Sequence, residues 1–131
     1  MYLYNYKVVS IDRIVDGDTV DLTVDLGFSI LIKHRFRLEG FDAPETWRPK
    51  SDIENTAGIS VTGYLTALLK GYEGSLFVKS VNLGIYGRYG AELYAETDEG
   101  PISINEAVSE FLVKNKITKP DIREQEKKQW K

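Results

Sequence analysis

Three acidic residues stand at positions that hydrophobic patterning alone does not explain. Asp18 follows the turn dipeptide Asp16-Gly17, Asp42 lies in a loop after a run of strand character, and Glu45 follows a proline. Singly, each has an ordinary structural explanation, because aspartate caps nearby amides in turns and glutamate beside proline is commonly a solvated residue. Together, these oxygen-bearing side chains are the first candidates for chemistry in this chain.

Two arginines are the second set of candidates. Arg37 alternates with two apolar neighbours, so it shares the opposite face of a strand with Arg35 and Glu39. Arg88 lies close to two glycines, which let a backbone approach a bulky anion. Both arginines also have an ordinary interpretation, on a solvated strand face and in a soluble turn, and the residues alone leave the choice open.

The absence of cysteine and the scarcity of histidine limit the kinds of catalytic and metal site that this chain can form. The chain has no cysteine and a single histidine, His34. Disulfide partners, thiolate zinc sites, cysteine nucleophiles and His-x-x-x-His zinc motifs are therefore excluded, and Ser/His catalysis is disfavoured. Any catalysis must use carboxylates, arginines or hydroxyls.

The overall composition is that of one globular domain. The 131 residues are 42% hydrophobic and 28% charged, without a run of 18 apolar residues, which excludes a membrane-spanning helix, collagen and wholesale disorder. Residues 1–9 alternate in polarity and lack the features of a secretion signal, so we expect a cytoplasmic protein; processing of a longer, secreted precursor stays open.

The charge distribution gives only a weak indication about partners. The net charge of −3 argues weakly against a nucleic-acid partner, although local arrangement can override the sum. Residues 114–131 hold seven basic and three acidic residues, so the positive charge is concentrated at the tail. We expect no membrane partner and a monomer.

The apolar pattern predicts five strands, two helices and a tail that can be helical. The strands are predicted at 2–15, in two runs within 18–38, at 75–81 and at 89–96, and the helices near 54–70 and from Ser103 onward. Five short strands with a helix between the third and fourth suit a partly closed Greek-key barrel. We predict an α+β fold, an OB-fold-type five-stranded barrel with two to three helices packed on it, in a domain of residues 1–118 followed by a basic tail, 119–131.

Several short segments together carry a resemblance to a known family. They are Asp16-Gly17-Asp18-Thr19-Val20, Phe36-Arg37-Leu38, Phe41-Asp42-Ala43-Pro44-Glu45, Tyr86-Gly87-Arg88 and Asn105-Glu106-Ala107. In this order, over about residues 8–112, the chain resembles the staphylococcal nuclease (thermonuclease) family. The resemblance implies an OB-fold nuclease that hydrolyses phosphodiester bonds in DNA, RNA or both, using calcium.

The resemblance also implies a metal site. Asp18 and Asp42 would bind the metal through their carboxylates and Ala43 through its backbone carbonyl, with Asp16 just outside these ligands. Oxygen donors without histidine or cysteine suit calcium, with magnesium as the alternative, and disfavour zinc.

Three further residues receive catalytic roles from the resemblance. Glu45 would orient, and could deprotonate, the attacking water, while Arg37 and Arg88 would bind the phosphate and its developing negative charge. Aromatic side chains near these positions could stack on bases or could equally be packing residues; they are Trp47, Tyr86 and Tyr89. Low sequence specificity is expected, because nothing resembles a base-reading helix.

The chain also departs from the family's founding member. The segment between Asp18 and Arg37 is several residues longer, with the added length around 26–34, and Ala43 replaces the usual threonine. Residues 113–131 do not match the founder's third helix. The same barrel also serves as a binding module for nucleic acid or protein, and a structural protein with a vestigial site stays open. Retention of all five acidic and arginine positions favours the nuclease.

Overall fold

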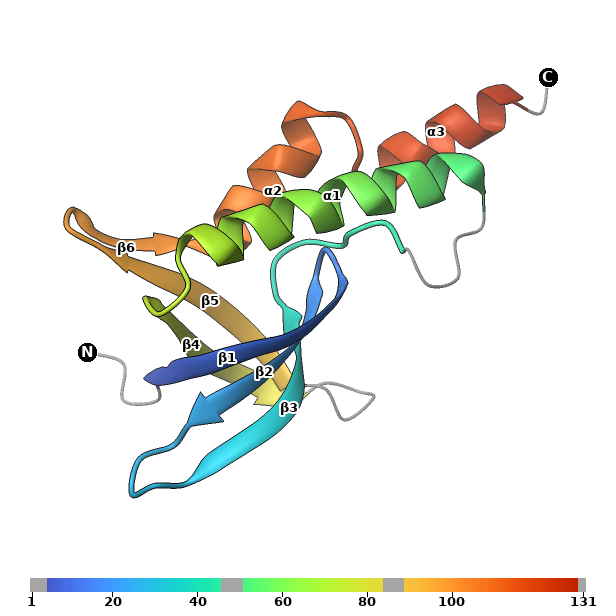
Figure 1. Cartoon of the computed structure of the whole chain (residues 1–131). Helices are drawn as coiled ribbons and strands as arrows, with labels where there is room; N and C mark the ends of the chain where they lie inside the picture. Colours follow the sequence, from blue (N-terminus) through green and yellow to red (C-terminus); the bar gives the residue numbers. More distant parts are fainter. Residues whose placement is uncertain (1–4, 46–50, 84–88, 130–131) are drawn as a thin grey trace.

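The computed structural model describes residues 5–45, 51–83 and 89–129. Among these residues, three strands come first, then one helix, three further strands and two final helices, in the order shown in Figure 1. The elements are β1 (Asn5–Asp16), β2 (Thr19–Asp25), β3 (Leu31–Leu38), α1 (Asp52–Gly71), β4 (Leu76–Leu83), β5 (Tyr89–Thr97), β6 (Gly100–Ser103), α2 (Ile104–Lys114) and α3 (Lys119–Gln129). No helix among these is long and apolar enough to cross a membrane.

The strands form a closed barrel. They lie in the order β3-β2-β1-β4-β5-β6, and neighbours in this order pair in antiparallel fashion. A parallel pairing of β3 with β5, which places Phe36 opposite Tyr89 and Leu38 opposite Ala91, closes the sheet on itself. Strands β1 to β5 thus form the barrel, and β6 extends the sheet beyond β5. The predicted α+β fold with a five-stranded OB-fold-type barrel is therefore confirmed.

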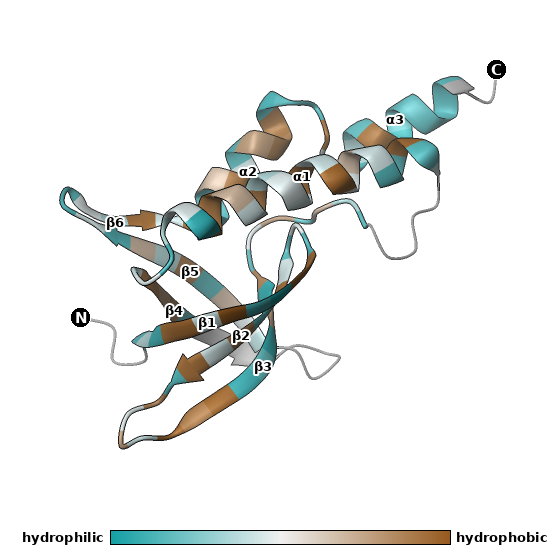
Figure 2. Cartoon of the chain, in the orientation of Figure 1, coloured by the Kyte–Doolittle hydropathy of each residue, from teal (hydrophilic) through white to brown (hydrophobic). Residues whose placement is uncertain are grey.

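The core fills the barrel and the space under the helices. Alternate residues of β2 face inward, and Val20, Leu22 and Val24 are almost completely buried. Helix α1 adds its apolar stripe, including Val61 and Leu65 with no exposed surface. Figures 1 and 2 show the helices gathered at one end of the barrel, while the tip of the β2–β3 hairpin lies at the other end.

The helix starts follow the predicted capping chemistry. Ser103 caps α2, because its Oγ accepts a hydrogen bond from the Glu106 amide at 3.1 Å. Ser51 does the same for α1 with the Glu54 amide at 3.1 Å, so this helix begins two residues before the predicted 54. Helix α3 begins at Lys119, and Pro120 lies in its first turn, where proline is tolerated because an amide hydrogen there has no partner within the helix.

One strand was not predicted. The segment Gly100–Ser103 pairs with the end of β5 as β6, in a register that joins Thr97 to Gly100. Glycine and proline are both depleted in strands, and this segment contains one of each. Because the strand lies at the edge of the sheet, Pro101 is tolerated there despite lacking an amide hydrogen.

Candidate functional site

The β1–β2 turn and the segment after β3 meet at one end of the barrel wall. The register of β2 with β3 places Thr19 opposite Arg37, so Asp18 lies beside the end of β3. The Leu38 amide donates to the Asp18 carbonyl at 2.7 Å. Beyond β3 the chain turns at Gly40, whose φ of 100° is in the left-handed region that glycine adopts easily. This turn carries Asp42 back toward Asp18.

The Asp18 carboxylate is the buried centre of the site. Its side chain is only 7% exposed. Oδ2 accepts a hydrogen bond from the Ala43 amide at 2.9 Å and lies 3.2 Å from Nη1 of Arg37, while Oδ1 accepts from Oγ1 of Thr19 at 2.9 Å. A buried carboxylate is costly unless such partners compensate it. The Ala43 bond also fastens the Asp42 segment to the β1–β2 turn.

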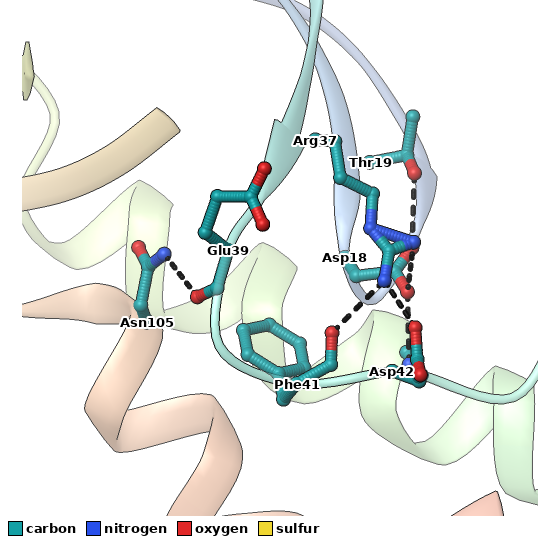
Figure 3. Close-up of polar contacts among 8 residues, drawn as sticks. Asp18, Thr19, Arg37, Glu39, Phe41, Asp42 and Asn105 are labelled. Carbon is teal, nitrogen blue, oxygen red and sulfur yellow. Dashed lines mark hydrogen bonds and ion pairs between the residues drawn. The ribbon is translucent and has the colours of Figure 1, made fainter. Parts of the chain in front are cut away.

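The guanidinium of Arg37 contacts both carboxylates, as Figure 3 shows. Its Nη2 donates to the Phe41 carbonyl at 3.1 Å and forms an ion pair with the Asp42 carboxylate. Burial works to lower the pKa of Arg37, but attraction to Asp18 and the hydrogen bond to Asp42 outweigh it and raise that pKa. Arg37 is therefore a permanent cation at this position.

Asp42 is the exposed member of the pair of carboxylates. Its side chain is 60% exposed. The hydrogen bond from Arg37 is the main cause that lowers the pKa of Asp42, with partial burial opposing it. Both acids thus face one guanidinium, from segments more than twenty residues apart.

Gly17 lets the β1–β2 turn lie directly against helix α1. A Cβ at this position would lie 2.7 Å from Cγ1 and 2.9 Å from Cγ2 of Val61, and 3.0 Å from Cβ of Ala43. No side chain fits in that space without displacing the helix or the Asp42 segment. Close packing against Val61 and Ala43 therefore explains why the residue before Asp18 is a glycine.

Asn105 has a role that sequence reasoning missed. It is buried at the start of α2, and its Nδ2 donates to the Glu39 carbonyl at 2.8 Å and the Ala91 carbonyl at 3.0 Å. Its Oδ1 accepts from the Leu93 amide at 2.9 Å. Asn105 therefore joins α2, β5 and the chain just after β3 (Figure 3). The sequence feature that could have indicated this role is the polar residue Asn105 at the start of an otherwise apolar helical stripe.

The structure does not bring the other acidic candidates into this cluster. Glu45 is exposed and forms no hydrogen bond or ion pair with described residues. Asp16 is half-buried at the end of β1, close enough to Arg35 to help raise its pKa, after the larger effect of the Asp21 hydrogen bond. Ala43 contacts the site through its amide, which donates to Asp18.

The remaining candidates are an arginine and three aromatic residues. Arg88, Tyr86 and Trp47 lie outside the described residues. The ring of Tyr89 packs against that of His34, with centroids 4.4 Å apart, and against Phe36 at 6.2 Å. These contacts give Tyr89 a packing role at the start of β5.

The donors at Asp18 and Asp42 fit a hard divalent cation in chemical type. Carboxylate oxygens are the ligands that calcium and magnesium take, and one or two protein carboxylates with water are a common set for magnesium. Two carboxylates facing the same positive group would also both face a metal ion near it. Among the residues that the structure describes, no group of three or more His, Asp or Glu side chains is placed to hold a metal.

The sequence matches no model of a known protein family and no curated protein.

Proposed function

We propose that this chain is a metal-dependent nuclease of the thermonuclease type, which hydrolyses phosphodiester bonds in DNA, RNA or both with low sequence specificity. Calcium is the expected metal and magnesium the alternative. The support lies in the motif set of the sequence and in the OB-fold-type barrel that positions its first two segments side by side.

One observation carries the proposal. Asp18 and Asp42 come from different segments, yet both contact the guanidinium of Arg37. A buried carboxylate, a second carboxylate and a fixed cation at one point of the surface are the groups that phosphodiester hydrolysis needs, since the phosphate is an anion that gains negative charge in the transition state.

The residues of the chain would act as follows. Three partners hold Arg37, so its guanidinium is oriented before substrate binds, and of its five N–H donors at least two remain for phosphate oxygens. Glu45, on the exposed segment after Asp42, would accept a proton from the attacking water. A divalent cation held by Asp18 and Asp42 would add positive charge beside the scissile phosphate.

A second candidate function is a binding module without catalysis. The specific observation in its favour is that Arg37 already neutralises both carboxylates, in a described part of the chain that offers no third metal-ligating side chain. In that case the cluster would hold the loop in place and the barrel would bind nucleic acid or protein.

Cleavage assays with matched variants separate the two. Single- and double-stranded DNA and RNA are incubated in calcium, magnesium or chelator with the parent protein, Arg37→Gln, Glu45→Gln and Arg123→Gln. Arg123 is exposed on α3 and forms no hydrogen bond or ion pair with the described site residues, so its substitution removes the same charge without removing a contact of the site. We expect metal-dependent cleavage that falls at least about 100-fold with either site variant, the scale of losing one oriented charge-stabilising group, and little change with Arg123→Gln.

A binding measurement gives a second readout that does not depend on turnover. Calcium should raise the midpoint of thermal unfolding of the parent, because a ligand bound only by the folded state stabilises it, and should raise that of Asp42→Asn much less. Cleavage that survives chelator, or that both site variants retain, would overturn the proposed metal-dependent mechanism. Strand binding without cleavage in any metal would establish the binding module instead.

A further inference from the structure

The tip of the β2–β3 hairpin exposes more apolar surface than the fold requires. Phe28 is 99% exposed, Leu31 55%, Ile30 53% and Leu26 37%, and these four are neighbours in the sequence. Figure 1 shows this tip at the end of the molecule opposite to the helices. Contiguous exposed apolar residues of this kind mark interaction surfaces, whereas scattered ones do not.

The tip is built in a conformation that displays the phenylalanine. The Leu26 amide donates to the Ile30 carbonyl at 2.8 Å, and the Gly27 amide to Oδ1 of Asp25 at 2.7 Å. Gly27, Phe28 and Ser29 have φ values of 87°, 54° and 64°. Positive φ is unfavourable for a bulky residue such as phenylalanine, and here no burial of the ring compensates for it. Strain without a packing gain points to a role in binding.

A row of cations joins this tip to the candidate site. Lys33, Arg35 and Arg37 are alternate residues of β3, so they lie on the same face of the strand. Lys33 is exposed and forms no ion pair with described residues. Arg35 is half exposed; two hydrogen bonds, at 2.8 and 3.1 Å, hold its guanidinium on Asp21 and leave other N–H donors outward.

We propose that the outer face of β3 and the hairpin tip bind a single nucleic-acid strand beyond the cleavage site, with phosphates on Arg35 and Lys33 and a base stacked on Phe28. This inference rests on the nucleic-acid substrate of the proposed function. Strands 2 and 3 are the face with which OB-folds bind oligonucleotides, and a cationic groove with an aromatic ring is the usual platform for single strands.

The charges favour a nucleic acid over a lipid surface. Residues 25–32, which form the tip, contain no lysine or arginine and one carboxylate, Asp25. A loop that inserts its apolar residues into an anionic membrane is helped by a cluster of basic residues around it, whereas Lys33, Arg35 and Arg37 form a row that leads along β3 away from the tip. The cations lie along the strand instead, where a chain of phosphates would follow them.

The geometry sets the length of strand required. Six residues separate Arg37 from Leu31, which is about 20 Å along β3. A strand stacked at about 3.4 Å per nucleotide needs roughly six nucleotides to reach from the site to the tip, and fewer if extended. A dinucleotide cannot contact both, whereas an oligonucleotide of about 15 can.

The test measures the affinity for these two lengths in chelator, so that no cleavage occurs, by fluorescence anisotropy. Phe28→Leu keeps an apolar side chain but removes the ring, and Phe28→Trp keeps a ring. We expect the first to weaken binding of the 15-nucleotide strand by about 5- to 150-fold, the range for losing one base–aromatic stack, and the second to retain it. The ratio of the affinity for the 15-nucleotide strand to that for the dinucleotide should fall in Phe28→Leu and stay unchanged in Phe28→Trp.

The charge contribution is tested in the same assay as a function of salt. Lys33→Gln should lower the slope of log affinity against log salt by about 0.7, the value for one phosphate contact on a single strand, and Lys33→Arg should restore it. Val113→Ala, which trims an exposed apolar residue of α2, serves as the control for surface change as such.

Three results would overturn the inference. The first is that Phe28→Leu binds the 15-nucleotide strand as tightly as the parent does. The second and third are that Phe28→Leu differs from the parent only in binding to lipid vesicles, or only in oligomeric state. These outcomes leave the nuclease intact if Arg37→Gln still abolishes cleavage. Conversely, strand binding that depends on Phe28 and Lys33, without cleavage in any metal, would support the hairpin site and refute the nuclease.

Discussion

At the scale of residues, the site consists of polar and charged side chains that compensate one another's burial and charge. Asp18 is buried because three donors surround it, and Arg37 keeps its charge because two carboxylates face it. Asn105 completes the arrangement from behind, through the Glu39 carbonyl at the beginning of the segment that carries Asp42. The chemistry proposed for Asp42 therefore depends on an amide side chain that would not touch the substrate.

Asn105→Ala tests that dependence. The substitution removes the partner of the Glu39 carbonyl and of the Leu93 amide, whereas the Ala91 carbonyl keeps its bond from the Glu39 amide, so we expect the free energy of unfolding to fall by about 2–3 kcal/mol. Urea unfolding measures it. Asn115→Ala is the control, because Asn115 donates to the Phe111 carbonyl at 2.9 Å on the exposed end of α2 and should cost less than about 1 kcal/mol. Equal losses in the two variants would refute the role of Asn105.

At the scale of elements, the decisive contact is that of the β1–β2 turn with α1. Gly17 has no room for a side chain, because Val61 of α1 and Ala43 lie against it. The helix thus supports the turn that presents Asp18. A bulkier turn would move Asp18 away from Arg37 before it affected the core of the barrel.

Gly17→Ala is expected to destabilise the fold by about 1–3 kcal/mol, as for overpacking of a filled interior. In a Val61→Ala background the same change should cost much less, since the clashing methyl groups are gone. Gly63→Ala, at an exposed position of α1 where a Cβ meets nothing, should instead stabilise by about 0.5–1 kcal/mol. Thermal or urea unfolding of the four variants measures these values, and an unchanged cost in the Val61→Ala background would refute the steric explanation.

The elements also show which parts of the structure can be predicted from the sequence. Val20, Leu22 and Val24 face inward as their alternation predicts, and the Ser103 cap begins α2 where predicted. The meeting of Asp18 and Asp42 at Arg37 depends on the register of β2 with β3 and on the turn at Gly40. Neither is encoded in a local pattern, so the motifs could suggest this cluster only through a family resemblance.

At the scale of the whole molecule, stability should depend on acid because several carboxylates bind protons less readily when folded. Hydrogen bonds from Arg37, Arg35 and Thr23 are the leading causes that lower the pKa values of Asp42, Asp21 and Asp12, respectively. A lowered pKa in the folded state means that the unfolded state binds more protons, so stability rises with pH through this range. The contribution is present above the ordinary aspartate pKa of about 4 and is lost as pH falls through the folded-state pKa.

The variant Asp42→Asn measures how much this carboxylate contributes to the pH dependence of stability. The free energy of unfolding of the parent should fall between pH 5 and pH 2.5, and the variant should show a smaller fall, modest in size because Asp42 is 60% exposed. Asp98→Asn removes a carboxylate that forms no hydrogen bond or ion pair with described residues, and controls for the loss of an acid as such. Identical acid profiles in the parent and Asp42→Asn would contradict the ion pair.

The parallel pairing that closes the barrel has a consequence for synthesis on the ribosome. The segment that carries Asp42 is held at Glu39, whose amide donates to the Ala91 carbonyl at 3.0 Å and whose carbonyl accepts from Asn105. Both anchors follow Asp18, Arg37 and Asp42 by about fifty residues or more in the chain. A nascent polypeptide that has emerged only through β4 therefore carries all three side chains and the β2–β3 register, but it lacks the two anchors that hold the Asp42 segment at Glu39. Competence for the proposed hydrolysis would arise late in translation, after most of the domain has left the exit tunnel.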